Sequence, residues 1–300
     1  MELQIIRHKS TSDYFRDFFP PDTAAAYSYQ LQRMFESGAA KEGDYFLVKD
    51  DGKPYLQAEI YRNNTRRIWE KTPVISPKAV PESKKTAEAV GLIYDFLKSD
   101  EFYFNPSDRL EILIYEGTAF SEAMKIISKQ YGYEHVGEYI EYSLRISDGI
   151  YAEIPDGIYF TPFTAFAPED RFRIVFEQNE LKKYYENTDP VLIYQDFLDD
   201  GYFSEELWEI IYSDNELSGF IMPAFTSGLK DKIRLLNYNI IDESTQNNSI
   251  AVVNRVIKIC ANMKVSKAEL VLNIQHQVMI RELLNKGAVK VGSFHRYIKK

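Results

Sequence analysis

Alternating and helically spaced apolar residues divide the first half of the chain into a clear order of elements. Two alternating apolar runs flank Asp-Asp-Gly in residues 44–61, DYFLVKDDGKPYLQAEIY, and predict a β-hairpin. The apolar residues of KTAEAVGLIYDFLKS, 85–99, recur at helical spacing. A further helix is expected to start at Ser121 as N-cap and to end at Gly132. The remaining predicted elements are strands at 3–8, 66–76 and 109–116 and a helical region at about 12–37.

The second half repeats this order. Residues 207–225, LWEIIYSDNELSGFIMPAF, predict a second hairpin. Residues 249–263 predict a helix whose apolar face includes the single cysteine, Cys260. The other predicted elements are strands at 158–166, 232–241 and 267–274 and helices at about 168–203 and at 277–287.

A short phrase occurs twice, 155 residues apart. GYEHVGEYIEY occupies residues 132–142, and GAVKVGSFHRY occupies residues 287–297. With the shared order of elements, this phrase indicates a duplicated unit. We therefore predict an α/β fold of the α+β type, with two similar domains at 1–148 and 156–300. Each domain is expected to contain a mixed, mostly antiparallel sheet flanked by helices.

Composition narrows the function classes. The net charge of −9 and the absence of a basic stripe argue against nucleic acid as a partner. No apolar run reaches the roughly 18 residues of a membrane span, and the first residues lack a signal-peptide core, so we expect no membrane association. A single cysteine excludes an intrachain disulfide and suggests a cytoplasmic protein. We expect Cys260 to serve packing.

A loop in the second half carries a family resemblance. Residues 241–251, IDESTQNNSIA, follow a predicted strand and open a predicted helix. They resemble the loop Arg/Gln-x-x-Gly-x-Gly/Ala of the GNAT (GCN5-related N-acetyltransferase) superfamily. Gln246 takes the first place, Ser249 the glycine place and Ala251 the last small place. Residues 276–294, HQVMIRELLNKGAVKVGSF, resemble the helix and Val-Gly strand that follow in this family.

The resemblance implies a tandem GNAT protein whose second half binds an acyl-CoA co-substrate, with acetyl-CoA favoured. A helix N-terminus presents unpaired N–H groups and a positive dipole end, both of which attract pyrophosphate. The alternative is an ordinary strand-to-helix turn, because Ser and Asn are common capping residues. The resemblance assigns these residues to the cofactor: Ile241, Gln246, Asn247, Asn248, Ser249, Ile250 and Ala251.

The first half departs from this loop pattern. Its corresponding stretch, SPKAVPESKKTAEA, contains Pro77 and Pro81 and no glycine. Proline removes backbone donors that a phosphate cradle needs. Lys84 and Lys85 could hold phosphate as point charges or could form a solvated helix start. We therefore expect that the first half does not bind the cofactor.

The residues expected for catalysis differ from the family pattern. The family tyrosine that protonates the leaving thiolate corresponds to Leu283 here, and to Ser128 or Ile127 in the first half. Tyr238, or less directly Tyr297, is the candidate substitute, although either could be a core or edge residue. The candidate bases are Glu209, Asp242, Glu243 and His276; surface carboxylates and a helix-capping histidine are the alternatives.

We expect no metal site. His8, His135 and His295 have no Cys, Asp or Glu neighbours at metal-ligand spacing. Walker, dinucleotide-binding and nucleophile-elbow motifs are absent from the sequence.

The favoured function is an acyl-CoA-dependent N-acyltransferase acting on a small-molecule amine, as a monomer or homodimer. Acidic residues would suit a cationic acceptor, unless they form a solvated loop: Asp199, Asp200, Glu205 and Glu206. A catalytically silent tandem GNAT fold that binds a ligand or partner is the main alternative, because the motif Tyr and Gly are missing. An aminoacyl transferase of the peptidoglycan-bridge type is a third possibility. This sequence shows no basic stretch suited to tRNA, which argues against it.

Overall fold

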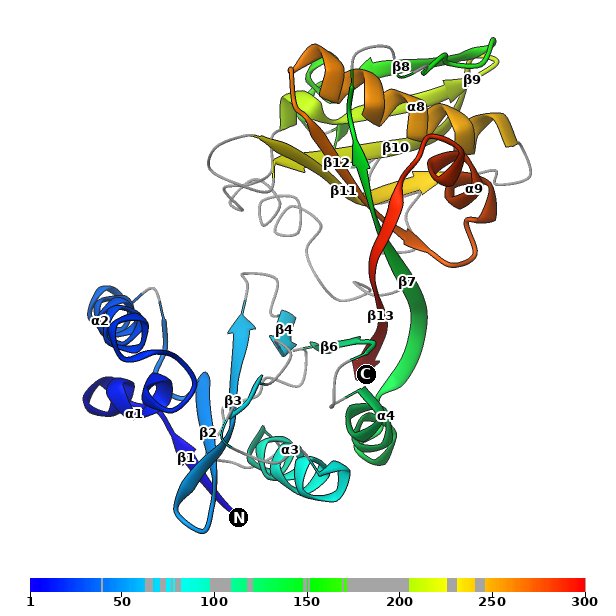
Figure 1. Ribbon diagram of the computed structural model, residues 1–300. Helices are drawn as coiled ribbons and strands as arrows, with labels where there is room; N and C mark the ends of the chain where they lie inside the picture. Colours follow the sequence, from blue (N-terminus) through cyan, green and yellow to red (C-terminus); the bar gives the residue numbers. More distant parts are fainter. Residues whose placement is uncertain are drawn as a thin grey trace. The chain divides into compact units, whose positions relative to one another are not determined.

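We describe the protein from a computed structural model, in which the chain forms two compact units. The first unit comprises Met1–Val136 with Phe294–Lys300, and the second comprises Gly137–Ser293. Figure 1 draws the described elements of each unit. The structure describes residues 1–299 except 39, 63–66, 71–73, 77, 79–81, 98–108, 118–120, 148–149, 151, 169, 172–204, 226–230 and 241–245.

The first unit is built on a mixed β-sheet with the strand order β1-β2-β3-β4-β6-β13. Strands β4 and β6 run parallel, and the other neighbours in this order run antiparallel. A short strand, β5 (Val74–Ile75), pairs with β3 outside this order. The strands of the order are β1 (Glu2–Ile5), β2 (Tyr45–Asp50), β3 (Lys53–Arg62), β4 (Arg67–Glu70), β6 (Arg109–Tyr115) and β13 (Val289–Lys299).

Helices cover both faces of this first sheet. Leu47 of β2 packs with Tyr14 and Leu31 on one face, whereas its neighbours Phe46 and Val48 join a second core on the other. Burial of a large apolar side chain contributes about 1.5–3 kcal/mol, so this alternation fixes the register of β2. The helices are η1 (His8–Ser10), α1 (Thr11–Arg16) and α2 (Pro21–Ser37) on the Leu47 side, and α3 (Ser83–Leu97) and α4 (Ser121–Gln130) on the Phe46 side.

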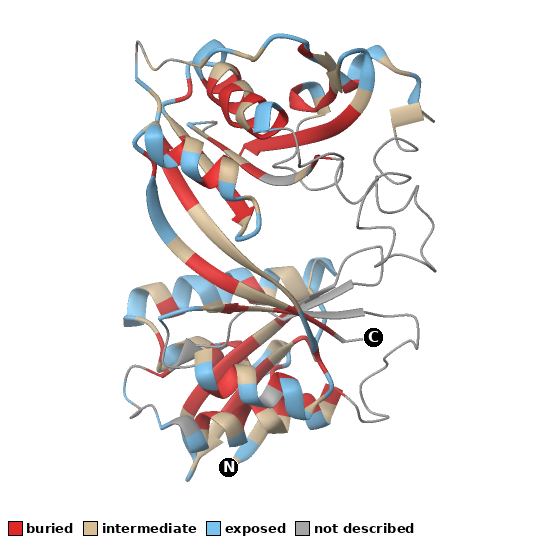
Figure 2. Cartoon of the chain, turned by 90° about the vertical axis from the view of Figure 1, so that its right-hand side faces the viewer, coloured by how far each residue is buried: buried red, intermediate tan, exposed pale blue. Residues whose placement is uncertain are grey.

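The second unit repeats this arrangement with the strand order β7-β12-β11-β10-β9-β8. Strands β11 and β12 are its parallel pair. Figure 2 shows buried residues along the strands and on one side of the helices. The elements are β7 (Glu134–Arg145), β8 (Ile158–Pro162), η2 (Phe163–Ala165), η3 (Glu205–Leu207), β9 (Glu209–Ser213), β10 (Glu216–Phe225), β11 (Lys232–Ile240), α8 (Gln246–Asn262), β12 (Lys267–Asn273) and α9 (Gln277–Asn285).

Mixed, mostly antiparallel sheets with flanking helices confirm the predicted fold class. The helical region expected at 168–203 lies mostly outside the described residues. None of the described helices is both long and apolar enough to cross a membrane.

The two hairpins turn in the same way. Asp51 and Gly52 have φ of 47° and 73°, and Asp214 and Asn215 have φ of 51° and 67°. Two consecutive residues at positive φ match the twist of antiparallel strands, and Asp, Asn and Gly tolerate this conformation best. Both predicted hairpins are confirmed.

The helices α4 and α9 also end in the same turn. Gly132 and Gly287 have positive φ, 78° and 84°, as their predicted terminating role requires. In each turn, the residue after the glycine donates its N–H to a carbonyl of the last helical turn, at 2.8 Å in the first unit and 3.0 Å in the second. The duplication in the sequence is therefore a duplication of backbone geometry.

The final strand of each half of the sequence pairs in the sheet that the other half builds. Strand β7 pairs antiparallel with β12, and β13 pairs antiparallel with β6. Tyr142 consequently packs in the core of the second unit, and Tyr297 packs in the core of the first. The compact units therefore differ from the domains expected at 1–148 and 156–300, which each kept their own last strand. Because the two phrases resemble each other, the sequence pattern alone does not specify which sheet each joins.

This exchange predicts opposite effects for two matched substitutions. Tyr297→Ala should destabilise the first unit by roughly 3 kcal/mol, because it leaves a cavity in that core. Hydrogen exchange should then accelerate in β6 and leave β12 protected. Tyr142→Ala should accelerate exchange in β12 and leave β6 protected. Faster exchange in β12 after Tyr297→Ala would show that each half keeps its own strand.

Candidate functional site

The parallel strands β11 and β12 stop pairing with each other before either strand ends. Their ladder runs from Lys232↔Lys267 to Leu235↔Leu270, although β11 continues to Ile240 and β12 to Asn273. On the other side of β11, the pairing with β10 shifts register by one residue, so that Leu236 is an extra, bulged residue. A bulge bends its strand and increases the local twist. In the ladder that the structure describes, the end of β11 therefore has no strand partner on β12.

The bulge also decides where Tyr238 points. Without an extra residue, Tyr238 would lie on the face opposite to Leu235, because side chains alternate along a strand. With the bulge, Tyr238 lies on the same face as Leu235, the face that packs against α8. Its ring meets the ring of His276 edge-on, with centroids 5.2 Å apart and planes at 63°. The Asn273 N–H lies 3.4 Å from its phenol oxygen, a long hydrogen bond.

His276 occupies the N-cap position of α9, but its side chain makes no capping hydrogen bond. Its backbone is held instead: its N–H donates to the carbonyl of Asn273 at 3.0 Å, and its carbonyl accepts from Ile280 at 3.1 Å. The imidazole is thereby directed to Tyr238. The structure thus brings together two of the residues predicted for catalysis, from a strand and from a helix start.

Glu209, the third candidate, lies on the same face but is held by an ion pair. Glu209 and Tyr238 both pair with Ile221, so they are in register two strands apart. The Glu209 carboxylate accepts two hydrogen bonds from Arg255 of α8, one from Nε at 2.6 Å. The hydrogen bond to Glu209 raises the pKa of Arg255, which also lies over the ring of Phe160 at 5.4 Å. This geometry favours a structural role for Glu209 over that of a general base.

The predicted phosphate cradle is the first turn of α8, which begins at Gln246. Asn248 donates its side-chain amide to the hydroxyl of Ser218 on β10 at 2.7 Å, which anchors the helix start to the sheet. Ser249 is only 4% exposed, and Ala251 is buried, so neither side chain faces solvent. Gln246 and Asn247 are exposed. The groups that this turn can offer an anion are therefore its backbone N–H groups rather than the Ser249 hydroxyl.

Other predicted candidates lie away from this site or outside the described residues. Ile241, Asp242 and Glu243 fall outside the described part of the chain, as do Asp199 and Asp200. Tyr297 lies in the core of the first unit. Glu205 pairs with Arg171 at 2.8 Å. Leu283 and Ser128, at the positions of the family tyrosine, are fully buried.

Cys260 is buried in the core of the second unit, as expected. Burial raises the pKa of its thiol to about 12. A thiol that stays protonated at neutral pH is a poor nucleophile, so Cys260 serves packing.

The first unit has a charged cavity near the start of α3. Its volume is about 390 Å³. Lys85 pairs with Asp50 at 3.0 Å, and Lys78 pairs with Asp17 at 2.7 Å. The charged lining residues balance, because Lys53, Lys78 and Lys85 face Asp17, Asp50 and Glu82. A cavity with balanced charges offers little net attraction to an anion such as pyrophosphate.

Comparisons with known proteins agree with the architecture. No protein-family model matches the sequence, and no curated protein matches it significantly. A GCN5-related N-acetyltransferase from Sphaerobacter thermophilus superposes with a TM-score of 0.61 at 14% identity, over 99% of this chain and 95% of that one. A tandem GNAT protein from the clavulanic acid biosynthesis pathway superposes with a TM-score of 0.52 at 10% identity, over 99% of this chain and 98% of that one. The chain therefore has the tandem GNAT fold.

The Glu209–Arg255 pair predicts a stability effect. Glu209→Ala should lower the free energy of unfolding by about 2–3 kcal/mol, because it leaves a partly buried guanidinium without its partner. Urea unfolding followed by circular dichroism measures this change. Glu216→Ala, an exposed carboxylate on β10, is the control and should change stability by less than about 0.5 kcal/mol. Equal effects of the two substitutions would contradict a structural role for the pair.

Proposed function

We propose that the second unit binds an acyl-CoA, most favourably acetyl-CoA, and transfers the acyl group to a small-molecule amine. The parting of β11 and β12 beside the first turn of α8 is the observation that carries this proposal. The tandem GNAT fold supports acyl transfer as the class of reaction.

The chain offers complementary groups to each part of such a donor. The N–H groups of Gln246, Asn247 and Asn248 would meet the pyrophosphate at the positive end of α8. The amide-bearing arm of coenzyme A would lie where β11 leaves β12, since strand backbone without a ladder partner can hydrogen-bond an extended chain. The ion-paired cavity of the first unit gives no comparable arrangement.

Tyr238 and His276 would share the proton transfers. The amine nitrogen attacks the thioester carbonyl carbon and loses a proton to the His276 imidazole. The C–S bond breaks, and the departing thiolate takes a proton from the Tyr238 phenol. The proton on His276 then restores Tyr238 directly or through water, so that the products are an amide and a free thiol. Their edge-on ring contact supports a shared role for the two side chains.

A silent ligand-binding protein is the second candidate function. Leu283 is buried at the place of the family acid, and Ser249 is buried at the place of a family glycine. A chain with this fold could keep the donor site and lack catalysis. In either case, the proposed partners exclude nucleic acid, the proposed location is cytoplasmic, and the chain acts as a monomer or homodimer.

Asn247→Asp tests the donor site through two opposite effects. A carboxylate in the first turn of α8 should stabilise the free protein by about 0.3–1 kcal/mol through the helix dipole. The same charge should weaken acetyl-CoA binding by about 1–2 kcal/mol, roughly 5- to 30-fold in Kd. Thermal shift without ligand and calorimetric titration with acetyl-CoA measure the two effects.

Gln30→Glu, which adds the same charge to an exposed position of α2, is the control and should leave the Kd unchanged. Equal Kd values for wild type and Asn247→Asp would show that the phosphates bind elsewhere. Absence of any binding at millimolar acetyl-CoA would overturn the proposed function itself.

Tyr238→Phe tests whether the site is catalytic. Loss of the phenol should lower kcat for thiol release by at least about 100-fold, the usual contribution of a general acid. The Kd for acetyl-CoA should change by less than about twofold, because the ring and its contact with His276 remain. Tyr212→Phe removes a phenol from β9 and serves as the control.

Thiol release by the wild type across a panel of amines provides the baseline. Acetyl-CoA binding without thiol release from any amine would favour the silent ligand-binding protein. An unchanged kcat in Tyr238→Phe would remove Tyr238 from the reaction.

A further inference from the structure

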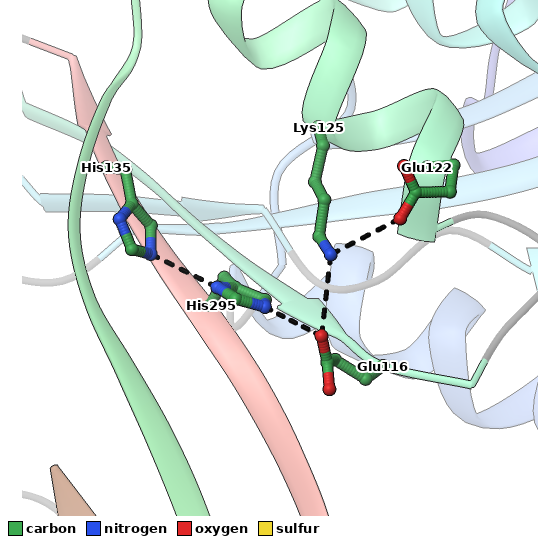
Figure 3. Close-up of polar contacts among 5 residues, drawn as sticks. All are labelled: Glu116, Glu122, Lys125, His135 and His295. Atoms are coloured by element: carbon green, nitrogen blue, oxygen red, sulfur yellow. Dashed lines mark hydrogen bonds and ion pairs between the residues drawn. The ribbon is translucent and has the colours of Figure 1, made fainter. Parts of the chain in front are cut away.

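Two histidines that are distant in the sequence meet in the first unit. His135 Nε2 lies 3.1 Å from His295 Nδ1, and His295 Nε2 lies 2.8 Å from Glu116 Oε1 (Figure 3). The rings of the two histidines lie 5.2 Å apart at 49°. Spacing along the sequence predicted no such cluster, because 160 positions separate the two histidines. Strand pairing brings them together.

The strand framework fixes each member of this group. His295 lies on β13 and is paired with Ile114 of β6, and Glu116 follows the end of β6 directly. His135 lies at the start of β7, and its ring packs at 5.0 Å from that of Tyr297 on β13. The three side chains therefore project from ordered strands or from the residue that directly follows one, which limits their freedom.

Glu116 orients the imidazole of His295. Its carboxylate accepts from His295 Nε2 and lies 3.4 Å from the Lys125 ammonium of α4, which in turn reaches Glu122 at the same distance (Figure 3). A carboxylate at Nε2 favours the proton on that nitrogen, which leaves a lone pair on Nδ1. This nitrogen lies 3.1 Å from His135 Nε2.

We infer that His135 Nε2 and His295 Nδ1 form a binding site for a divalent transition metal ion, with Zn²⁺ as the reference ion. Zinc–nitrogen bonds of about 2.0–2.1 Å to two nitrogens 3.1 Å apart subtend roughly 98° at the metal, which lies between octahedral and tetrahedral angles. The ion replaces the proton that the two nitrogens share, and His135 then carries its proton on Nδ1.

The second ring nitrogen of His295 already has the partner that such sites require. Metal-bound histidines usually donate their other N–H to a carboxylate, which raises their basicity and fixes their orientation. His135 is exposed, so water can complete the coordination shell. Imidazole ligands select Zn²⁺, Ni²⁺ or Co²⁺ over Mg²⁺ and Ca²⁺, which prefer oxygen. The site lies in the first unit and does not depend on acyl transfer in the second.

Calorimetric titration of the full chain with ZnCl₂ tests this inference. Wild type should bind one Zn²⁺ per chain, and His135→Ala should weaken that binding at least tenfold. Glu116→Gln retains both ligands and should weaken binding by about 10-fold, the lower end of the effect of losing a carboxylate partner. His8→Ala removes a half-buried histidine, which contacts Glu36 at 3.2 Å, and should leave the affinity within twofold of wild type.

Titration with Co²⁺ supplies an independent readout, because nitrogen coordination changes its visible absorption. The spectral change should appear in wild type and in His8→Ala and disappear in His135→Ala. Zinc binding of equal affinity in wild type and His135→Ala would overturn the site. The absence of Zn²⁺ binding to wild type at millimolar concentration would also overturn the site. The same holds if Mg²⁺ binds with an affinity equal to that of Zn²⁺. Melting temperatures without metal confirm that the variants remain folded.

Discussion

Antiparallel pairing of β6 with β13 and of β12 with β7 is the constraint on which both units depend. In each sheet, the central parallel pair has one edge that only a strand from the other half of the sequence covers. An uncovered edge exposes a row of N–H and C=O groups and invites association with other chains. Neither half of the sequence therefore contains all the strands of the sheet that it begins. This makes the folding of one unit depend on the presence of the other half of the chain.

Within the second unit, the bulged residue Leu236 determines the position of Tyr238. Leu236 ends the pairing of β11 with β12 and at the same time turns Tyr238 to the face of α8 and α9. One local change therefore provides both an opening between strands and a phenol beside it. Asn248 fixes the start of α8 to β10 through Ser218, so the helix end is positioned by the same sheet. The groups proposed for binding and for reaction are thus positioned by the same sheet.

Apolar periodicity and turn residues predict the individual helices, strands and turns. They do not predict which strands pair with each other. Gly132, Gly287 and the hairpin residues require particular φ values, so the sequence alone identifies their turns. Tyr142 and Tyr297 were recognised as equivalent, yet equivalence does not specify which sheet each joins. Tyr238 and His276 were predicted separately, but their contact depends on a bulge that no residue type marks.

The sequence also does not predict which charged side chains pair with each other. Glu209 is a predicted base because it offers a carboxylate near the start of the second hairpin. Its pairing with Arg255 follows from the packing of α8 over β9, which periodicity predicts only as burial. His135, His295 and Glu116 lie together because β13 pairs with β6 of the first unit. The spacing of the histidines in the sequence does not predict this contact.

The two units share the same order of strands and helices, but the side chains at corresponding positions differ. Near the start of α3, Lys78 pairs with Asp17 and Lys85 pairs with Asp50. At the start of α8, helix donors meet an opening between strands. Leu283 on α9 cannot supply the acid that the family position provides, but Tyr238 approaches the same helix from β11 through His276. In the proposed reaction, a phenol on a strand would take the role of the acid, and the bulge at Leu236 sets the face of the sheet on which that phenol lies.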